Sequence, residues 1–131
     1  MPKQKIKEGQ RKNKKQLRKI ADVLWFHKLL KPQCEVCNKP SQFVHHFYYK
    51  SSFSHLRYEL DNGISLCKSC HFLLHTKDPK IIESKIIEKR GQKWLKKLTK
   101  KAFQKPKPSF QTEKWYNEQI KQLQNYANGN L

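Results

Sequence analysis

Residues 34–75 read CEVCNKPSQFVHHFYYKSSFSHLRYELDNGISLCKSCHFLLH, and the cysteine pairs near the two ends decide how this segment folds. The first pair is Cys34 and Cys37, the second is Cys67 and Cys70, and the sequence has no other cysteine. Each Cys-x-x-Cys turn can present two thiolates to one ion, and four thiolates at about 2.3 Å suit tetrahedral zinc. The sequence therefore predicts a structural Zn²⁺ that joins both ends of the segment.

The stretch between the two cysteine pairs is long. It comprises 29 residues, which exceeds the gap of the commonest zinc ribbons and indicates an inserted element. Disulfide bonds are an alternative use of the four thiols, but a cytosolic chain without a secretion signal disfavours them. A redox Cys-x-x-Cys motif is a further alternative, although it leaves the second pair unexplained.

The composition is that of a small chain with a modest apolar core. Of 131 residues, 36% are apolar and 30% are charged, which leaves room for one small domain with extensions. Such a core often needs a metal, and bound zinc can supply folding free energy on the order of 10 kcal/mol. We expect an N-terminal arm and helix over 1–33, a central module over 34–78, and a C-terminal helical extension over 79–131.

The apolar stretches are too short for a membrane span. The sequence has no run of 18 apolar residues. Asp22, His27 and Lys28 interrupt the segment 20–30, which therefore lacks the apolar stretch of a signal peptide. The expected location is the cytosol of a bacterium or of a phage-infected host.

The net charge of +19 is concentrated in two blocks. Residues 1–19 carry nine basic and one acidic side chain, and residues 80–107 carry eleven basic and two acidic ones. The stretch 20–79 has a net charge of only +2, and the last 24 residues are neutral. Basic blocks of this kind bind polyanions through counterion release, so DNA is the expected partner. A solvated lysine-rich surface and binding to anionic lipid are the alternatives.

Hydrophobic periodicity and breaker residues predict mostly helices around one hairpin. Helices are expected over 12–30, 67–76, 79–98 and 112–126. Pro32 ends the first helix, and Gly91 is a candidate interruption of the third. Residues 43–48 and 60–66 are predicted to pair as strands, and residues 1–11 are expected to be a disordered arm.

Four histidines and one asparagine lie within 31 residues of the same segment: His45, His46, Asn62, His71 and His75. The two adjacent histidines fall in the first predicted strand and the asparagine in the second. The last two histidines are four residues apart on a predicted helix, so they share one helical face and can share an ion. A single histidine is more often structural, but this concentration favours a catalytic or metal site.

The order of these motifs, from Cys-x-x-Cys through His-His and Asn to Leu-Cys-x-x-Cys-His, resembles the HNH endonucleases over residues 34–75. The resemblance implies an α+β fold in which a small ββα-metal module, stapled by the four-cysteine zinc site, is flanked by basic helices. It also implies hydrolysis of DNA phosphodiester bonds to 5′-phosphate and 3′-hydroxyl ends.

The resemblance assigns a role to each residue of the constellation. His46 matches the general base, and Asn62 matches the residue that braces the loop bearing the base. The matched ligands of the catalytic metal are His45, His71 and His75. Neighbours in a regular strand point to opposite faces, so the family's solution of bending the chain is expected between His45 and His46.

A narrower resemblance concerns His-His-Phe, the run Leu56-Arg57-Tyr58-Glu59-Leu60-Asp61-Asn62 and the later Gly91. It is similar to small phage HNH proteins of the NinG/Rap recombination type, which act on branched DNA. Arg57 is then a candidate phosphate contact, and an exposed strand charge is its alternative interpretation. A nicking or homing-type enzyme competes with a junction-processing one.

The residue types suit metal-assisted hydrolysis. A histidine with an unperturbed pKa near 6.5 is largely neutral at physiological pH and can accept a proton. Magnesium prefers oxygen ligands, so a site built from imidazoles indicates Mn²⁺, Ni²⁺ or Zn²⁺ as well as Mg²⁺. The rival interpretation is a non-catalytic four-cysteine zinc module that binds DNA or RNA. A redox or membrane-surface protein is less favoured still.

Overall fold

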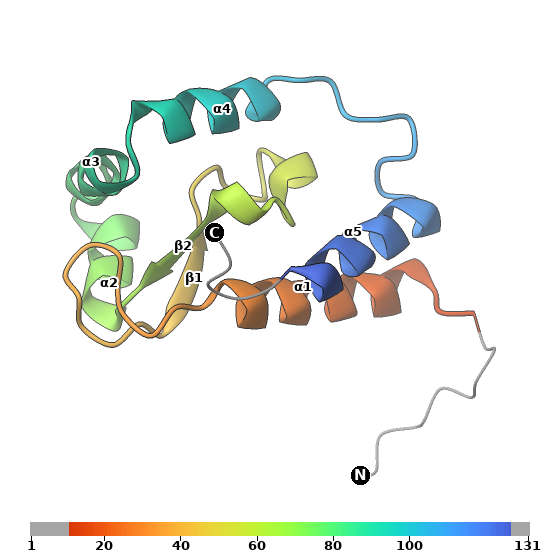
Figure 1. The fold of residues 1–131 in the computed structure, drawn as a ribbon, viewed down its shortest axis with the longest axis horizontal. Helices are drawn as coiled ribbons and strands as arrows, with labels where there is room; N and C mark the ends of the chain where they lie inside the picture. Colours follow the sequence, from red (N-terminus) through yellow and green to blue (C-terminus); the bar gives the residue numbers. More distant parts are fainter. Residues whose placement is uncertain (1–10, 127–131) are drawn as a thin grey trace, which may run out of the picture.

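The computed structural model describes residues 11–126 and combines, within them, five α-helices with one antiparallel pair of strands (Figure 1). The elements, in chain order, are α1 (Lys14–Leu29), β1 (Phe43–His46), β2 (Gly63–Leu66), α2 (Lys68–Thr76), α3 (Pro79–Arg90), α4 (Gln92–Ala102) and α5 (Glu113–Asn125). Two single-turn 3₁₀ helices, Ser54–Leu56 and Leu60–Asn62, lie in the long connection between the strands. The predicted α+β class is confirmed.

Helix α1 begins with a capping box, in which the Asn13 side chain accepts a hydrogen bond from the Gln16 backbone and the Gln16 side chain accepts one from the Asn13 backbone. The helix ends at Leu29, as Pro32 predicts. Its buried residues recur every fourth position at Leu17, Ala21, Trp25 and Leu29. They pack along α5, which makes this helix pair one core of the protein.

The hairpin is shorter than expected, because β1 ends at His46 and β2 begins only at Gly63. The strands pair with Phe43 opposite Leu66 and with His46 opposite Gly63. Asn62 therefore lies in a 3₁₀ turn before β2, and its predicted place within the second strand is wrong. The turn forms because Asn62 hydrogen-bonds the connecting loop and not the facing strand.

Helix α2 follows β2 directly, so the hairpin and this helix form the expected ββα unit. Cys67 is its N-cap. The single helix expected over 79–98 is two helices, α3 and α4, because Gly91 adopts φ 93° and breaks the run. The predicted last helix is confirmed, with Thr112 as its cap.

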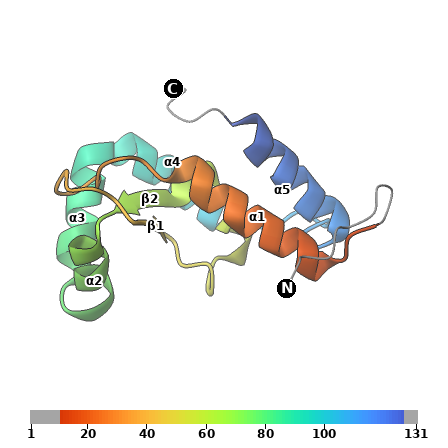
Figure 2. The ribbon, with the colours of Figure 1, turned by 90° about the horizontal axis from the view of Figure 1, so that it is seen from below.

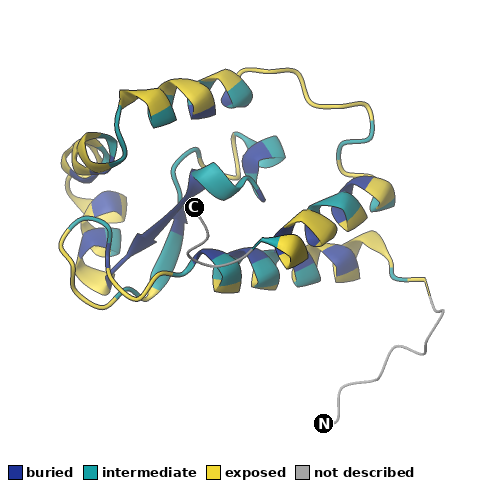
Figure 3. Cartoon of the chain, in the orientation of Figure 1, coloured by how far each residue is buried: buried dark blue, intermediate teal, exposed yellow. Residues whose placement is uncertain are grey.

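The hairpin lies between two helical layers (Figures 1 and 2). Helix α1, backed by α5, contacts both strands on one side, and α4 contacts the two 3₁₀ turns on the other. Strand β2 is buried along its whole length, whereas α3 and α4 expose most of their outward surface (Figure 3). Within residues 11–126, no helix is both long enough and apolar enough to cross a membrane.

The first cysteine turn is tied to the rest of the fold by a largely buried ion pair. Glu35 accepts two 2.8 Å hydrogen bonds from Arg90 of α3 and one from the backbone of Ser65 in β2. The two side chains are only 13% and 18% exposed. Burial by itself would raise the pKa of Glu35, but Arg90 and Ser65 outweigh it and hold that pKa below its usual range.

Glu35→Gln is expected to lower the free energy of unfolding by about 3 kcal/mol, because Arg90 is left buried without its counter-charge. The full loss of unfolding free energy is expected above the pKa that Glu35 has in the unfolded chain. The loss disappears as the pH falls through the lower pKa that Glu35 has in the folded state. Urea unfolding between pH 3 and 8 measures it. The control is Glu113→Gln, which removes an exposed partner of Arg11 and should leave stability unchanged. Equal effects of the two substitutions would contradict the prediction.

Candidate active site and cysteine cluster

The four cysteines converge on one point. Cys34 and Cys37 come from the turn before β1, and Cys67 and Cys70 from the start of α2. Their sulfur atoms all lie within 4.8 Å of one another, and the Sγ atoms of Cys37 and Cys67 are 3.4 Å apart. The edge of a tetrahedron with 2.3 Å metal–sulfur bonds is about 3.8 Å. The four thiols therefore fit a tetrahedral zinc ion.

The ionisation of these thiols is consistent with a bound cation. Burial opposes the ionisation of Cys67, but the backbone N–H of Cys70 and the other three thiols outweigh it and lower its pKa to about 7. Burial and its sulfur neighbours raise the pKa of Cys70 well above the ordinary value. One thiolate forms readily at neutral pH, whereas the ionisation of a second thiol is unfavourable. A divalent ion supplies the positive charge that full deprotonation requires.

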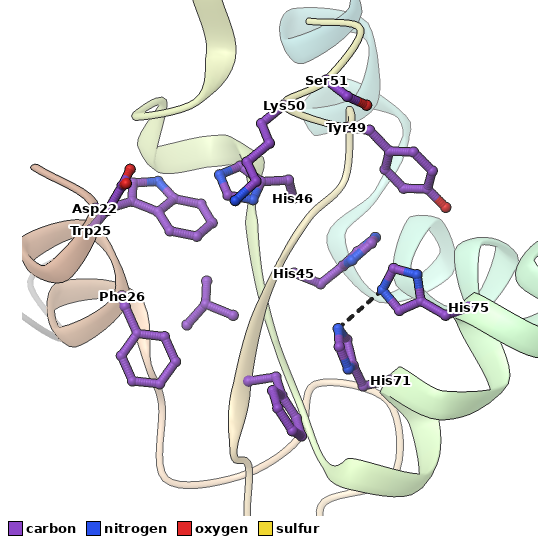
Figure 4. Close-up of a pocket in the computed structure, with 12 residues that line it drawn as sticks. Asp22, Trp25, Phe26, His45, His46, Tyr49, Lys50, Ser51, His71 and His75 are labelled. Atoms are coloured by element: carbon purple, nitrogen blue, oxygen red, sulfur yellow. Dashed lines mark hydrogen bonds between the residues drawn. The ribbon is translucent and has the colours of Figure 1, made fainter. Parts of the chain in front are cut away.

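Three of the predicted histidines form a second cluster, on the face of β1 that is turned toward α2 (Figure 4). His45 belongs to β1, and His71 and His75 lie one turn apart on α2. One nitrogen of each ring lies within 4.8 Å of the others, and the Nε2 atoms of His71 and His75 are 3.1 Å apart. Phe43 stacks on His71 with a centroid separation of 4.4 Å, which orients that ring.

Burial favours the neutral form of two of the three imidazoles, which suits them to bind a metal. His45 is 5% exposed. Burial, with the neighbouring His75, His71 and His46, lowers its pKa to about 3. Burial and His75 also lower the pKa of His71. Neutral imidazoles offer lone pairs to a divalent cation, and three protein ligands leave further positions open for water or substrate.

His46 lies on the other side of β1, against α1. Its ring stacks on Trp25 with a centroid separation of 4.0 Å and an interplanar angle of 7°. Its Nε2 is 2.9 Å from the carbonyl oxygen of Arg57. Because a carbonyl oxygen only accepts, Nε2 carries the proton and Nδ1 keeps its lone pair. This ring is therefore set up to take a proton at Nδ1.

The pKa of His46 is not the unperturbed value assumed from the sequence. Burial lowers it to about 4, and the charges of Lys50 and Arg57 act in the same direction. The hydrogen bond to Arg57 and the carboxylate of Asp22 oppose this shift only in part. The ring is neutral at physiological pH, as a proton acceptor must be.

His45 and His46 address opposite faces of the strand, as strand geometry requires. The expected bend between them is wrong, since β1 stays paired to β2 through His46. Both rings nevertheless border one pocket of about 650 Å³, which also includes His71, His75, Trp25 and Asp22. The two sides of β1 meet in this pocket because a two-stranded sheet leaves the outer edge of the strand uncovered (Figure 4).

Asn62 is fully buried and holds the connection that follows His46. Its Oδ1 accepts a hydrogen bond from the backbone N–H of Tyr48, and its Nδ2 donates to the carbonyl oxygens of Tyr48 and Leu56. Its own carbonyl accepts from Phe47. These bonds close the loop at both ends, which is the geometry a brace requires.

Arg57 lies in the turn after the first 3₁₀ helix and not in a strand. Its guanidinium makes two 2.8 Å hydrogen bonds to the carboxylate of Asp22 on α1. The sequence interpretation missed Asp22 and Trp25 as members of the pocket. The spacing of Ala21, Trp25 and Leu29 signals that Trp25 is buried, but no local pattern signals contact with His46.

Comparison with known proteins gives a match in this same part of the chain. Residues 34–77 match the family model described as HNH endonuclease. The match covers 44 of the 131 residues and includes both clusters, His46 and Asn62. No curated protein and no solved structure matches the chain. At the level of the family, the match supports a metal-binding enzyme of the nuclease type that acts on DNA.

Proposed function

We propose that this protein is a metal-dependent DNA endonuclease that hydrolyses phosphodiester bonds to 5′-phosphate and 3′-hydroxyl ends. The observation that carries the proposal is a single pocket that contains two different chemical functions. One is a cluster of three histidines able to hold a cation, and the other is a histidine with a free Nδ1 lone pair. The family match over the same residues agrees with it.

The residues of the pocket divide the reaction between them. His45, His71 and His75 would hold Mg²⁺, Mn²⁺, Ni²⁺ or Zn²⁺, and the bound ion would supply polarisation of the phosphate and stabilisation of the leaving 3′ oxygen. His46 takes a proton from the attacking water at Nδ1. Its Nε2–H remains bonded to the carbonyl of Arg57, which stabilises the imidazolium that results. Asn62 keeps the loop after His46 closed, and the four cysteines hold Zn²⁺ as a structural ion.

A non-catalytic zinc module that binds DNA or RNA is not favoured. A binder needs the basic blocks and the cysteine cluster, but it has no use for three converging imidazoles beside a fourth in a pocket. The narrower phage NinG/Rap likeness stays a prediction, and with it a preference for branched or recombination-intermediate DNA. Parallel cleavage assays on a four-way junction and on linear duplex test that preference.

The direct test is incubation of supercoiled plasmid with protein that retains its structural zinc, in buffer freed of other divalent metals, to which one divalent metal is added at a time. We expect nicked or linear DNA only with added metal, and ends that DNA ligase can rejoin. His71→Ala removes one proposed ligand and should abolish cleavage. The control is Phe72→Ala. Phe72 is the next residue on α2 and is 60% exposed, so its loss should not affect cleavage. Metal-independent cleavage, or full activity of His71→Ala, would refute the proposal.

DNA affinity is expected to reside in the basic blocks and not in the pocket. Lys93, Lys96 and Lys100 are exposed on α4, whereas most of the block 1–19, including the expected disordered arm up to residue 10, lies outside the described residues. Each phosphate contact adds roughly 0.9 to the slope of log K against log salt. Replacing the three lysines by glutamine should therefore reduce that slope by up to about 2.7.

Fluorescence anisotropy at increasing salt concentration measures the slope, and single-turnover cleavage at saturating protein should change little. Glutamine at Lys114 and Lys121, which lie on α5 in the neutral C-terminal stretch, provides the matched control. An unchanged slope with a lost reaction rate would mean that α4 shapes the pocket instead of binding DNA.

A further inference from the structure

We propose that Trp25, on α1 and outside the segment that matches the family, is a positioning residue that fixes the ring of His46 for proton transfer. The inference rests on the proposed role of His46 as the general base. It assigns to α1, in addition to its part in the core, one wall of the active site.

The contact between the two rings is close and parallel. The centroids are 4.0 Å apart and the ring planes differ by 7°. The indole is itself fixed, because Trp25 is 4% exposed and its Nε1 donates a hydrogen bond to the carbonyl of Glu59 at 3.2 Å. A buried ring anchored at its polar end is a rigid surface, and His46 lies flat against it.

The slot for this stack is created by a glycine. Gly63 faces His46 across the hairpin. A Cβ atom at Gly63 would lie 2.9 Å from the indole of Trp25 and 2.6 Å from the side chain of Leu29. Both distances are shorter than real Cβ contacts allow, and both neighbours are packed in the core. Glycine is therefore required here so that α1 can approach the strand closely enough for its tryptophan to reach His46.

Helix α1 also anchors the hydrogen-bond acceptor of His46. The carbonyl of Arg57 accepts from Nε2 of His46, and the guanidinium of the same residue is held by Asp22 through two 2.8 Å bonds. Asp22 and Trp25 are three residues apart and so lie on one face of α1. The stack fixes the plane of the imidazole, and the anchored carbonyl fixes its rotation within that plane.

Orientation of this kind has a large effect on rate and little effect on substrate binding. A displacement of about 1 Å in a reacting group can cost on the order of 10²-fold in rate. Trp25→Leu keeps an apolar side chain in the core but removes the flat surface and the N–H donor. We expect single-turnover cleavage to slow by about 10²-fold, with unchanged DNA affinity. Trp25→Phe retains a flat ring and should restore much of the rate.

The matched control is Trp115→Leu. Trp115 is 6% exposed and belongs to the same core cluster, where it contacts Tyr58, Phe110 and Tyr116. Its loss should lower stability as Trp25→Leu does, without a specific loss of rate. Ni²⁺ affinity of the histidine cluster, measured by calorimetry, should be the same in both variants. Equal slowing of cleavage by the two substitutions would overturn the inference.

A spectroscopic measurement tests the contact without any activity. Protons over the face of an indole resonate upfield, so the ring protons of His46 should be shifted upfield in NMR spectra of the wild-type protein and return downfield in Trp25→Leu. Cross-relaxation between the two rings should be visible in the wild type even if Trp25→Leu does not fold. The absence of that cross-relaxation would refute the stack. Normal stacking together with full cleavage by His46→Ala would instead refute the proposed role of His46 as the general base, on which the inference rests.

Discussion

His46→Ala is expected to lower the single-turnover rate of DNA cleavage by about 10²- to 10⁴-fold, the usual contribution of a general base. The reason is that the proton acceptor is lost while every proposed metal ligand remains. His46 stacks on Trp25 and takes no part in the histidine cluster, which lies on the other face of β1. The substitution therefore separates proton transfer from metal binding.

Quenched-flow cleavage at saturating protein measures the rate. Calorimetry with Ni²⁺ measures the metal affinity of the histidine cluster. Metal affinity and DNA affinity should equal those of the wild type, and the near-ultraviolet circular dichroism should show an intact core. The comparison variant is His71→Ala, which should lose rate and Ni²⁺ affinity together. Cleavage by His46→Ala at the wild-type rate, in a preparation free of contaminating nuclease, would exclude His46 as the base.

Cys67→Ser is expected to release zinc and to unfold the hairpin region. Losing one of four thiolates leaves the tetrahedron incomplete, and bound zinc contributes folding free energy on the order of 10 kcal/mol. Serine at this position is informative because Cys67 is also the N-cap of α2, where its sulfur accepts from the backbone of Cys70. Serine is a good N-cap, so the substitution removes the metal ligand and preserves the cap.

Metal analysis should give about one tightly held zinc per wild-type chain and none in Cys67→Ser. The variant should also lose dispersion in its amide NMR spectrum. Ser69→Ala, in the same turn and exposed, should keep both the metal and the fold. A wild-type protein without zinc, or a native mass that reports a disulfide, would contradict the assignment.

Much of the fold is predictable because it depends on local signals. Spacing of the cysteines indicated their cluster, and proline and glycine marked the ends of α1 and α3. Thr112 capped the last helix as expected. The approximate position of the hairpin also followed from its β-prone first strand. Each of these features is determined within a few residues of sequence, where propensity and capping act.

The remaining features depend on packing between distant segments. Asn62 lies outside the strand predicted for it because its hydrogen bonds go to the loop around Tyr48. Burial between α1 and β1 changed the pKa of His46. Arg57 pairs with Asp22, 35 residues away. Periodicity along the sequence does not predict contacts between distant segments. Trp25 could therefore be recognised as buried but not as a neighbour of the proposed base.

Helix α2 has a further consequence for how the protein responds to metal supply. Its nine residues span about 13 Å, and with its N-cap it provides two thiols to one cluster and two imidazoles to the other. Loss of zinc from the thiols would free the end of the helix, and His71 and His75 would then no longer be held toward His45. Thermodynamic linkage requires the reverse as well, so an ion on the histidines would strengthen retention of zinc. The two proposed metal sites would thus behave as one cooperative unit. In a cell short of zinc, the protein would lose its proposed nuclease activity together with its zinc.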